Sequence, residues 1–112
     1  MELHTFSSLT ADFLPQYKGC MDEADLAFVY FNPKVIEHKQ LTPITAQEVA
    51  QAFTDSAQTN TATFRVYTDS QHLQAHLQTL HYDNTALLIM SSGNFDGVNI
   101  KQFANNLLTN NQ

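Results

Sequence analysis

The stretch LAFVYF at residues 26–31 decides the fold class, because it places six apolar or aromatic residues in an unbroken run. A strand with one solvated face alternates apolar and polar side chains, whereas a strand covered on both faces does not need to alternate. Similar runs are FRVY at 64–67 and ALLIM at 86–90, and a shorter one covers residues 2–6. The sequence therefore predicts a sheet of four strands that helices cover.

Apolar side chains recur at helical spacing in four segments between and after these strands. The expected helices cover residues 9–24, 45–53, 70–80 and 100–107. Pro15 should kink or split the first helix. Thr45 and Glu48 form a capping-box signature at the second, and Asp69 is the expected N-cap of the third. Alternating strands and helices indicate βαβ units, so we expect an α/β domain with a mainly parallel sheet and helices on both faces.

Length and composition favour a single globular domain. At 112 residues the chain can form one core but not two, so we expect one domain over 1–112. Its formal charge of -6, from five Lys and Arg against eleven Asp and Glu, argues against a nucleic-acid partner. We find neither the ~20 apolar residues of a membrane helix nor a signal-peptide pattern, and expect no membrane partner and a cytoplasmic location. The lone Cys20 agrees with a reducing compartment and is expected on the buried side of a helix.

The loops that follow the strands are the natural place for a ligand, because the carboxyl ends of parallel strands meet at one edge of a sheet. Four loops should meet there: HTFSS (4–8), NPKVIEHKQLTP (32–43), YTDS (67–70) and SSGNFDG (91–97). In SSGNFDG, two glycines permit close backbone approach, and the next helix offers free N–H groups that suit a carboxylate or phosphate. The alternative is an ordinary turn in which Asp96 caps that helix.

Other polar clusters have ordinary structural explanations. Ser7 or Ser8 is expected to cap a helix, since no nucleophile elbow surrounds either serine. The triplet EHK at 37–39 is interpreted as a solvated cluster in a long loop. His72 and His76 have a spacing that can hold a metal, but no third ligand accompanies them, so we expect a solvated helix edge. We predict no catalytic residue and no metal site in this chain.

Three features, taken in order, resemble the C-terminal domain of the Mur ligases. They are a strand that ends in a His-containing loop, an acidic stretch that enters an apolar strand through Ala24–Asp25, and a strand followed by MSSGNF at 90–95. The resemblance extends from Glu2 to Leu108, carried by ELHTFSSLTADFLPQYKGCMDEADLAFVYFNP and LLIMSSGNFDGVNIKQFANNLL. Mur ligases use ATP to join amino acids or peptides to UDP-N-acetylmuramate for bacterial peptidoglycan. The resemblance implies a Rossmann-like three-layer α/β domain.

Three domains share the work in this family, and the resemblance implies that the UDP-sugar and ATP with magnesium bind to two domains outside this chain. The third domain closes over the site and helps to receive the acceptor. The implied acceptor-binding residues belong to the last and the first of the four loops: Ser91, Ser92, Gly93, Asn94, Phe95, Asp96, His4, Thr5 and Ser8. Thr5 and Ser8 stand where the alanine-adding branch has arginines, so a simple charge clamp on the acceptor is not expected.

Two branches of the family each fit part of the sequence. HTF at 4–6 resembles the ligase that adds L-alanine, whereas MSSGNF at 90–95 resembles the recycling ligase that attaches the L-Ala-γ-D-Glu-meso-diaminopimelate tripeptide. The acceptor is therefore open between alanine and tripeptide. We expect the C-terminal domain of a longer ATP-dependent ligase, inactive when isolated. The alternative is a freestanding α/β module that binds a small anion or an interaction partner without catalysis.

Overall fold

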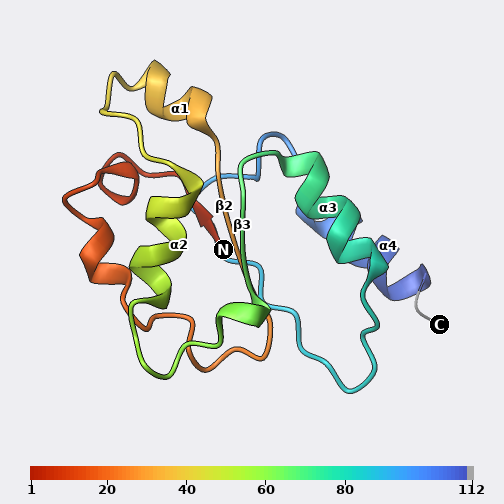
Figure 1. Cartoon of the computed structure of the whole chain (residues 1–112). Coiled ribbons are helices and arrows are strands. Elements are labelled where there is room, and N and C mark those ends of the chain that lie inside the picture. Colours follow the sequence, from red (N-terminus) through yellow and green to blue (C-terminus); the bar gives the residue numbers. More distant parts are fainter. Residues whose placement is uncertain (111–112) are drawn as a thin grey trace.

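Within residues 1–110, which the computed structural model describes, the sheet has three strands and all its pairs are parallel. The strands are β1 (Glu2–Leu3), β2 (Ala27–Phe31) and β3 (Phe64–Tyr67), in the order β1-β2-β3 (Figure 1). Glu2 lies opposite Tyr30. The predicted parallel sheet is confirmed for these three strands.

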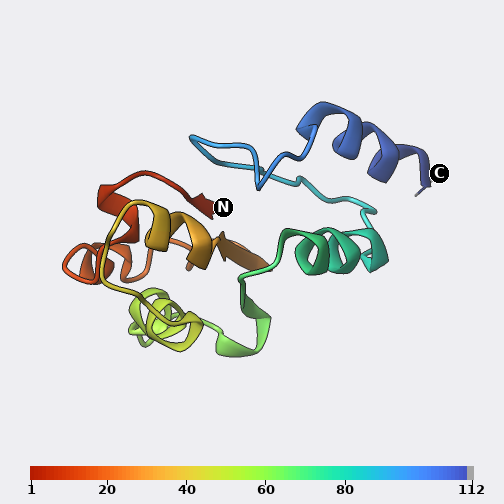
Figure 2. The same ribbon diagram turned by 90° about the horizontal axis from the view of Figure 1, so that it is seen from above.

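Helices lie on both sides of this sheet. Figure 2, which views the molecule from above, shows α1 and α2 on one side of the molecule and α3 and α4 on the other. The α-helices of the described chain are α1 (Pro33–His38), α2 (Ala46–Thr54), α3 (Ser70–Thr79) and α4 (Ile100–Asn110). Its short 3-10 turns are η1 (Ser7–Leu9), η2 (Leu14–Tyr17) and η3 (Thr61–Thr63).

The residues of β2 divide alternately between two cores. Ala27, Val29 and Phe31 belong to the core that includes residues of α1, α2, η1 and η2. Phe28 and Tyr30 belong to the core formed with α3 and α4. Because both faces of the strand are covered, its sequence needs no polar alternation. The expected three-layer, Rossmann-like α/β architecture is confirmed.

The predicted helix starts at α2 and α3 are confirmed, and local hydrogen bonds explain them. The Thr45 hydroxyl accepts the N–H of Glu48 at 3.1 Å, and the Glu48 carboxylate accepts the N–H of Thr45 at 3.3 Å. At α3, the Asp69 carboxylate accepts the N–H of Gln71 at 2.8 Å. These bonds satisfy N–H groups that have no partner inside the first helical turn.

The helix expected over residues 9–24 was wrong. η1 ends at Leu9, and the segment itself contains the 3-10 turn η2, with Pro15 in its first turn. Gly19 adopts a left-handed φ of +76°, and its N–H donates to the Phe53 carbonyl at 3.3 Å, so contact with α2 shapes this segment. The prediction that Cys20 is buried was also wrong, because Cys20 is exposed.

Residues 32–43, expected as a loop, contain the helix α1. The Asn32 side chain accepts the N–H of Lys34 at 2.9 Å, and Pro33 occupies the first helical turn. Both are ordinary helix-start signals. The charged triplet at 37–39 thus lies at the end of a short helix.

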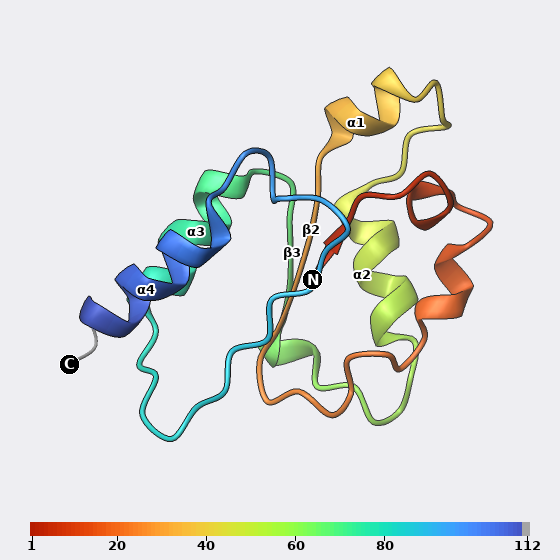
Figure 3. The ribbon, with the colours of Figure 1, turned by 180° about the vertical axis from the view of Figure 1, so that it is seen from behind.

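The fourth strand predicted over residues 86–90 is not part of the sheet. One backbone hydrogen bond ties this segment to β1, from the Glu2 N–H to the Met90 carbonyl at 2.9 Å. Figure 3 shows the connection from α3 to α4 passing beside the N-terminus. The segment remains largely in solvent, with Leu88 75% exposed.

Among the helices of residues 1–110, none has the length and apolar character needed to cross a membrane.

Candidate functional site

The buried carboxylate of Glu2 joins β1 to the loop at residues 91–97. Its side chain is only 3% exposed, and one oxygen, Oε1, accepts two hydrogen bonds from this loop. The donors are the Ser91 hydroxyl and the backbone N–H of Phe95, the latter at 3.0 Å. The structure therefore brings the first strand and SSGNFDG together, as the topology predicted.

Gly93 lets the two candidate loops approach each other. A Cβ atom at this position would lie 2.9 Å from Glu2 Oε1 and 2.9 Å from the His4 ring carbons Cγ and Cδ2. Contacts this short do not occur in stable packing, so only glycine fits without displacement of its neighbours. His4 Nδ1 also lies 3.8 Å from Glu2 Oε2. His4 and Gly93, both predicted site residues, are neighbours in space.

Three backbone N–H groups of SSGNFDG already have acceptors inside the protein. Gly93 N–H donates to the Ser91 hydroxyl at 2.7 Å, and Gly97 N–H donates to the Asn94 side chain at 2.8 Å. The Phe95 N–H is held by Glu2, as described above. These three N–H groups are therefore not available as a ready anion seat. The side chains of Ser91, Ser92, Asn94 and Asp96 belong to exposed residues and can meet a ligand.

Phe95 anchors the loop in the core beneath the site. It is 7% exposed, and its ring stacks on Tyr30 with a centroid separation of 5.9 Å. Its carbonyl accepts the Ser70 hydroxyl at 2.6 Å, which ties the loop to the start of α3. Of the predicted acceptor-binding residues, Phe95 is thus a buried support and not an exposed contact.

The predicted cap at Asp96 is wrong for α4. Asn99 precedes this helix, and its side chain accepts the N–H of Gln102 at 3.1 Å. Asp96 instead has a left-handed φ of 63° and lies in the loop before the helix. This leaves the Asp96 carboxylate in an exposed position at the edge of the site.

The first loop is organised by Thr5. Its hydroxyl accepts the N–H of Ser8 at 3.3 Å, and the Ser8 hydroxyl donates to the Thr5 carbonyl at 2.8 Å. No side-chain cap precedes η1, so the expectation that Ser7 or Ser8 caps a helix was wrong. Two of the predicted site residues thus bond to each other and hold the turn that follows His4.

A polar pocket of about 710 Å³ adjoins the 91–97 loop at the carboxyl ends of β2 and β3. Seven amide side chains line it, and all but Asn32 form two rows with the same i, i+3, i+7 spacing. One row comes from α3 and the other from Asn99 and α4. The rows are Gln71, Gln74 and Gln78, and Asn99, Gln102 and Asn106. Amides both donate and accept hydrogen bonds, so the rows suit a ligand that offers both kinds of group.

Charged groups at this pocket are mostly acidic. Asp69 and Asp96 line it, with Lys34 as its basic residue. Burial, followed by the negative charges of Asp96, Glu2 and Asp69, raises the pKa of Tyr30 to about 12. The carboxylates of Asp69 and Asp96 favour a positively charged group on a ligand over a negatively charged one.

The two spaced histidines play different parts. His72 is exposed, whereas the ring of His76 packs on Phe28 at a centroid distance of 5.0 Å and its Nδ1 is hydrogen-bonded to the Tyr67 hydroxyl. The expectation of a solvated histidine edge was therefore wrong for His76. Across residues 1–110, no three His, Cys, Asp or Glu side chains are grouped so that they could hold a metal ion.

Sequence reasoning missed three residues that build the site: Glu2, Tyr30 and Ser70. Each is buried, and each acts through a contact distant in sequence or through a pocket that only the fold creates. A charged residue within a short apolar strand was the available signal for Glu2, because buried carboxylates need partners.

No protein-family model, curated protein or solved structure matches the chain.

Proposed function

We propose that the chain is the C-terminal, acceptor-binding domain of a cytoplasmic, bacterial ATP-dependent ligase of the Mur type. The enzyme would join L-alanine or the L-Ala-γ-D-Glu-meso-diaminopimelate tripeptide to UDP-N-acetylmuramate. The observation that carries this proposal is the junction at Glu2, which holds SSGNFDG beside His4. The two loops that the resemblance assigns to the acceptor are thereby one surface.

The charges at this surface support an acceptor that carries an amine. Asp69 and Asp96 favour the ammonium end of an amino acid or peptide, and Lys34, which lines the same pocket, can meet a carboxylate. The N–H groups of residues 93, 95 and 97 are already bonded, so the loop is better suited to the amine than to an anion. The glycines and the N–H groups of the next helix had suggested that the loop binds the carboxylate of the acceptor. The bonds described here favour its amine instead.

In the proposed reaction, ATP converts the muramate carboxylate into an acyl phosphate, which the acceptor amine attacks with release of phosphate. The domains that bind UDP-sugar, ATP and magnesium lie outside this chain, and the residues described here bind and orient the acceptor. Orientation of this kind lowers the entropic barrier to attack. We therefore expect no turnover from the 112 residues alone.

Isothermal titration calorimetry tests the proposal. The chain is titrated separately with L-alanine, with the tripeptide, with ATP and magnesium, and with inorganic phosphate. We expect saturable heat with an acceptor and none with ATP or phosphate. Asp96→Asn should weaken acceptor binding at least tenfold, whereas Asp55→Asn, at an exposed site far along the chain from both loops, should leave it unchanged.

Each other outcome is informative. Binding of phosphate without binding of either acceptor favours the freestanding anion-binding module and contradicts the ligase domain. ATP binding at these loops contradicts the division of work between domains. Absence of heat with every ligand contradicts an acceptor site in this chain.

A further inference from the structure

The two amide rows of the polar pocket each begin near an acidic residue. Asp69 immediately precedes α3, and Asp96 lies in the loop before α4. Figures 2 and 3 show these helices side by side and running in the same direction. The pocket therefore has an acidic end beside residues 91–97 and a far end that Gln78 of α3 and Asn106 of α4 line.

Most amide side chains of the rows are open to a ligand. Gln74 Nε2 donates to the Ser70 hydroxyl at 3.1 Å, and the Asn99 side chain accepts the N–H of Gln102 at 3.1 Å. Apart from Gln74 and Asn99, the side chains of the rows belong to exposed residues and have no hydrogen-bond partner among residues 1–110. No hydrogen bond joins one row to the other in this part of the chain. Each row thus offers both N–H donors and oxygen acceptors to the pocket.

The length of the α3 row indicates the size of the ligand. Gln71 and Gln78 both lie within α3, and seven residues of helix advance by about 10.5 Å. An extended chain advances by roughly 3.4 Å per residue, so three residues cover this distance and a single amino acid does not. A ligand that contacts both ends of the pocket is therefore longer than one amino acid.

We propose that the two amide rows bind the backbone of a peptide acceptor, which is thereby selected by its length of about three residues. Its ammonium group lies at Asp69 and Asp96, and its peptide groups pair with the amides toward Gln78 and Asn106. An extended chain directs its N–H and C=O groups to alternate sides, so both rows find partners. Phe103, which lines the pocket and belongs to the core formed with α3 and α4, can contact small apolar side chains. This inference rests on the proposed function, because it favours the tripeptide over L-alanine as the acceptor.

Two other classes of ligand fit the pocket less well. The hydroxyl groups of a neutral sugar can pair with amides, but such a ligand leaves Asp69 and Asp96 without a cation. A phosphate compound places negative charge beside the same two carboxylates. The combination of an acidic end with amide walls therefore favours a peptide that has a free amine.

Nuclear magnetic resonance titration of the 112-residue chain tests the inference through the side-chain amide resonances of the rows. The probes are L-alanine amide and tri-L-alanine amide, which carry the same single positive charge and differ in backbone length. We expect tri-L-alanine amide to bind at least tenfold more tightly and to shift the side-chain amides of Gln78 and Asn106. L-Alanine amide should shift only the end beside residues 91–97. Methylation of both internal peptide nitrogens should weaken binding at least tenfold, and maltotriose should not bind.

Three protein variants locate the binding. Gln78→Ala and Asn106→Ala should each weaken the binding of tri-L-alanine amide at least fivefold and leave that of L-alanine amide unchanged. Asn105→Ala is the matched control, because Asn105 is an exposed amide residue of α4 that does not line the pocket, and it should change neither.

The outcomes separate this inference from the proposed function. Equal binding of the two alanine amides, equal effects of Asn105→Ala and Asn106→Ala, or binding of maltotriose at the rows would overturn the inference. Binding of L-alanine or the acceptor tripeptide at residues 4–8 and 91–97 would in that case still support the proposed function. Absence of binding by every one of these amines would overturn both.

Discussion

The carboxylate of Glu2 accepts the backbone N–H of Phe95 at 3.0 Å, across 93 positions of sequence. Since the same oxygen accepts the Ser91 hydroxyl, one buried side chain holds both ends of SSGNF. Removal of such a partner leaves a buried donor without an acceptor, which costs more than an ordinary hydrogen bond contributes. The position of the candidate site therefore depends on the packing of β1.

Replacement of Glu2 should destabilise the fold, and more so when both side-chain oxygens that can accept hydrogen bonds are removed. Glu2→Ala should lower the free energy of unfolding by about 2 kcal/mol, and Glu2→Gln, which keeps one oxygen acceptor, by about 1 kcal/mol. Urea unfolding measures both. Glu37→Ala, at an exposed position on α1, is the matched control and should change stability by less than ~0.5 kcal/mol. Equal effects of all three substitutions would show that Glu2 does not hold the loop.

Substitution of the two loop glycines should separate steric from conformational effects. Gly93→Ala places a methyl group 2.9 Å from the Glu2 carboxylate and the His4 ring, so it should shift the resonances of His4 as well as destabilise the fold. Gly97 has a φ of +87° and no atom near its missing Cβ. Gly97→Ala should therefore cost about 1 kcal/mol through backbone strain and leave His4 unmoved. Unshifted His4 resonances in Gly93→Ala would contradict the described contact.

Alkaline pH should unfold the protein partly through Tyr30. Burial raises the pKa of this tyrosine from 10.0 to about 12, so between these values the unfolded chain loses a proton that the folded chain retains. The contribution of Tyr30 to stability is therefore complete below pH 10 and declines as pH rises toward 12, by roughly 2–3 kcal/mol in total. Urea unfolding from pH 9 to 12 should show a smaller decline for Tyr30→Phe than for the unmodified chain. Identical pH dependences would refute the shifted pKa.

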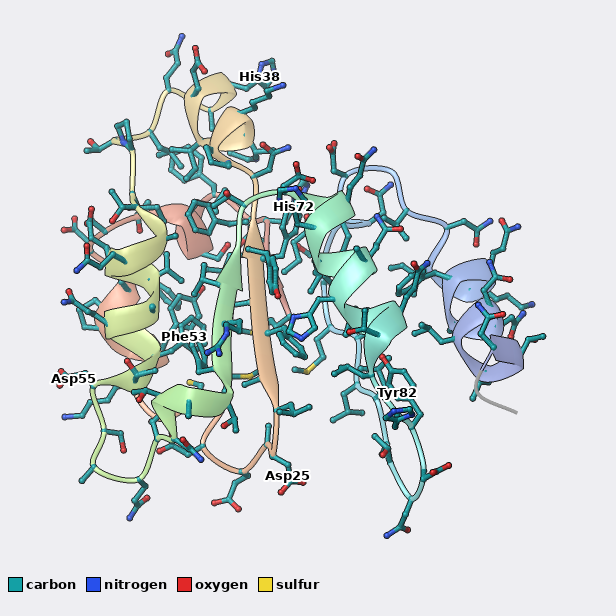
Figure 4. The ribbon with its side chains drawn as sticks, turned by 45° about the vertical axis from the view of Figure 1, so that its right-hand side comes forward. Asp25, His38, Phe53, Asp55, His72 and Tyr82 are labelled. Carbon is teal, nitrogen blue, oxygen red and sulfur yellow. The ribbon has the colours of Figure 1, made fainter. Side chains whose placement is uncertain are left out.

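Truncation of Phe53 should be among the most damaging core changes. Its ring is 0% exposed, stacks on Tyr17 at 4.7 Å and contacts Phe64 at 5.5 Å between centroids. Figure 4 shows it between α2 and the sheet. Phe53→Ala should cost about 4 kcal/mol in unfolding free energy, whereas Phe13→Ala, at a 38% exposed site, should cost about 1 kcal/mol. Thermal and urea unfolding of the pair test this difference.

Short-range signals predicted the helices that begin with local hydrogen bonds. Thr45 with Glu48 and Asp69 with Gln71 are close in sequence, so their bonds can be inferred from the residue pattern. The apolar run at 26–31 likewise indicates a strand covered on both faces. The parallel sheet and its helical layers follow from these features.

The failures have a common physical cause. An apolar run shows that a segment favours burial but not which partner covers it, and residues 86–90 satisfy the strand pattern without joining the sheet. In the same way, helical spacing over 9–24 was overridden by Pro15 and by the contact of Gly19 with α2. The role of Glu2 depends on a partner at the opposite end of the chain. No local pattern contains that information.

The most direct test of the central claim is a nuclear magnetic resonance titration of the chain with the acceptor tripeptide and with L-alanine. If residues 4–8 and 91–97 form one acceptor site, their amides should shift together and fit a single dissociation constant with at least one of these ligands. The amides of α2, including those of Glu48 and Val49, should stay in place. Absence of shifts in both loops, or shifts in only one of them, would contradict the claim.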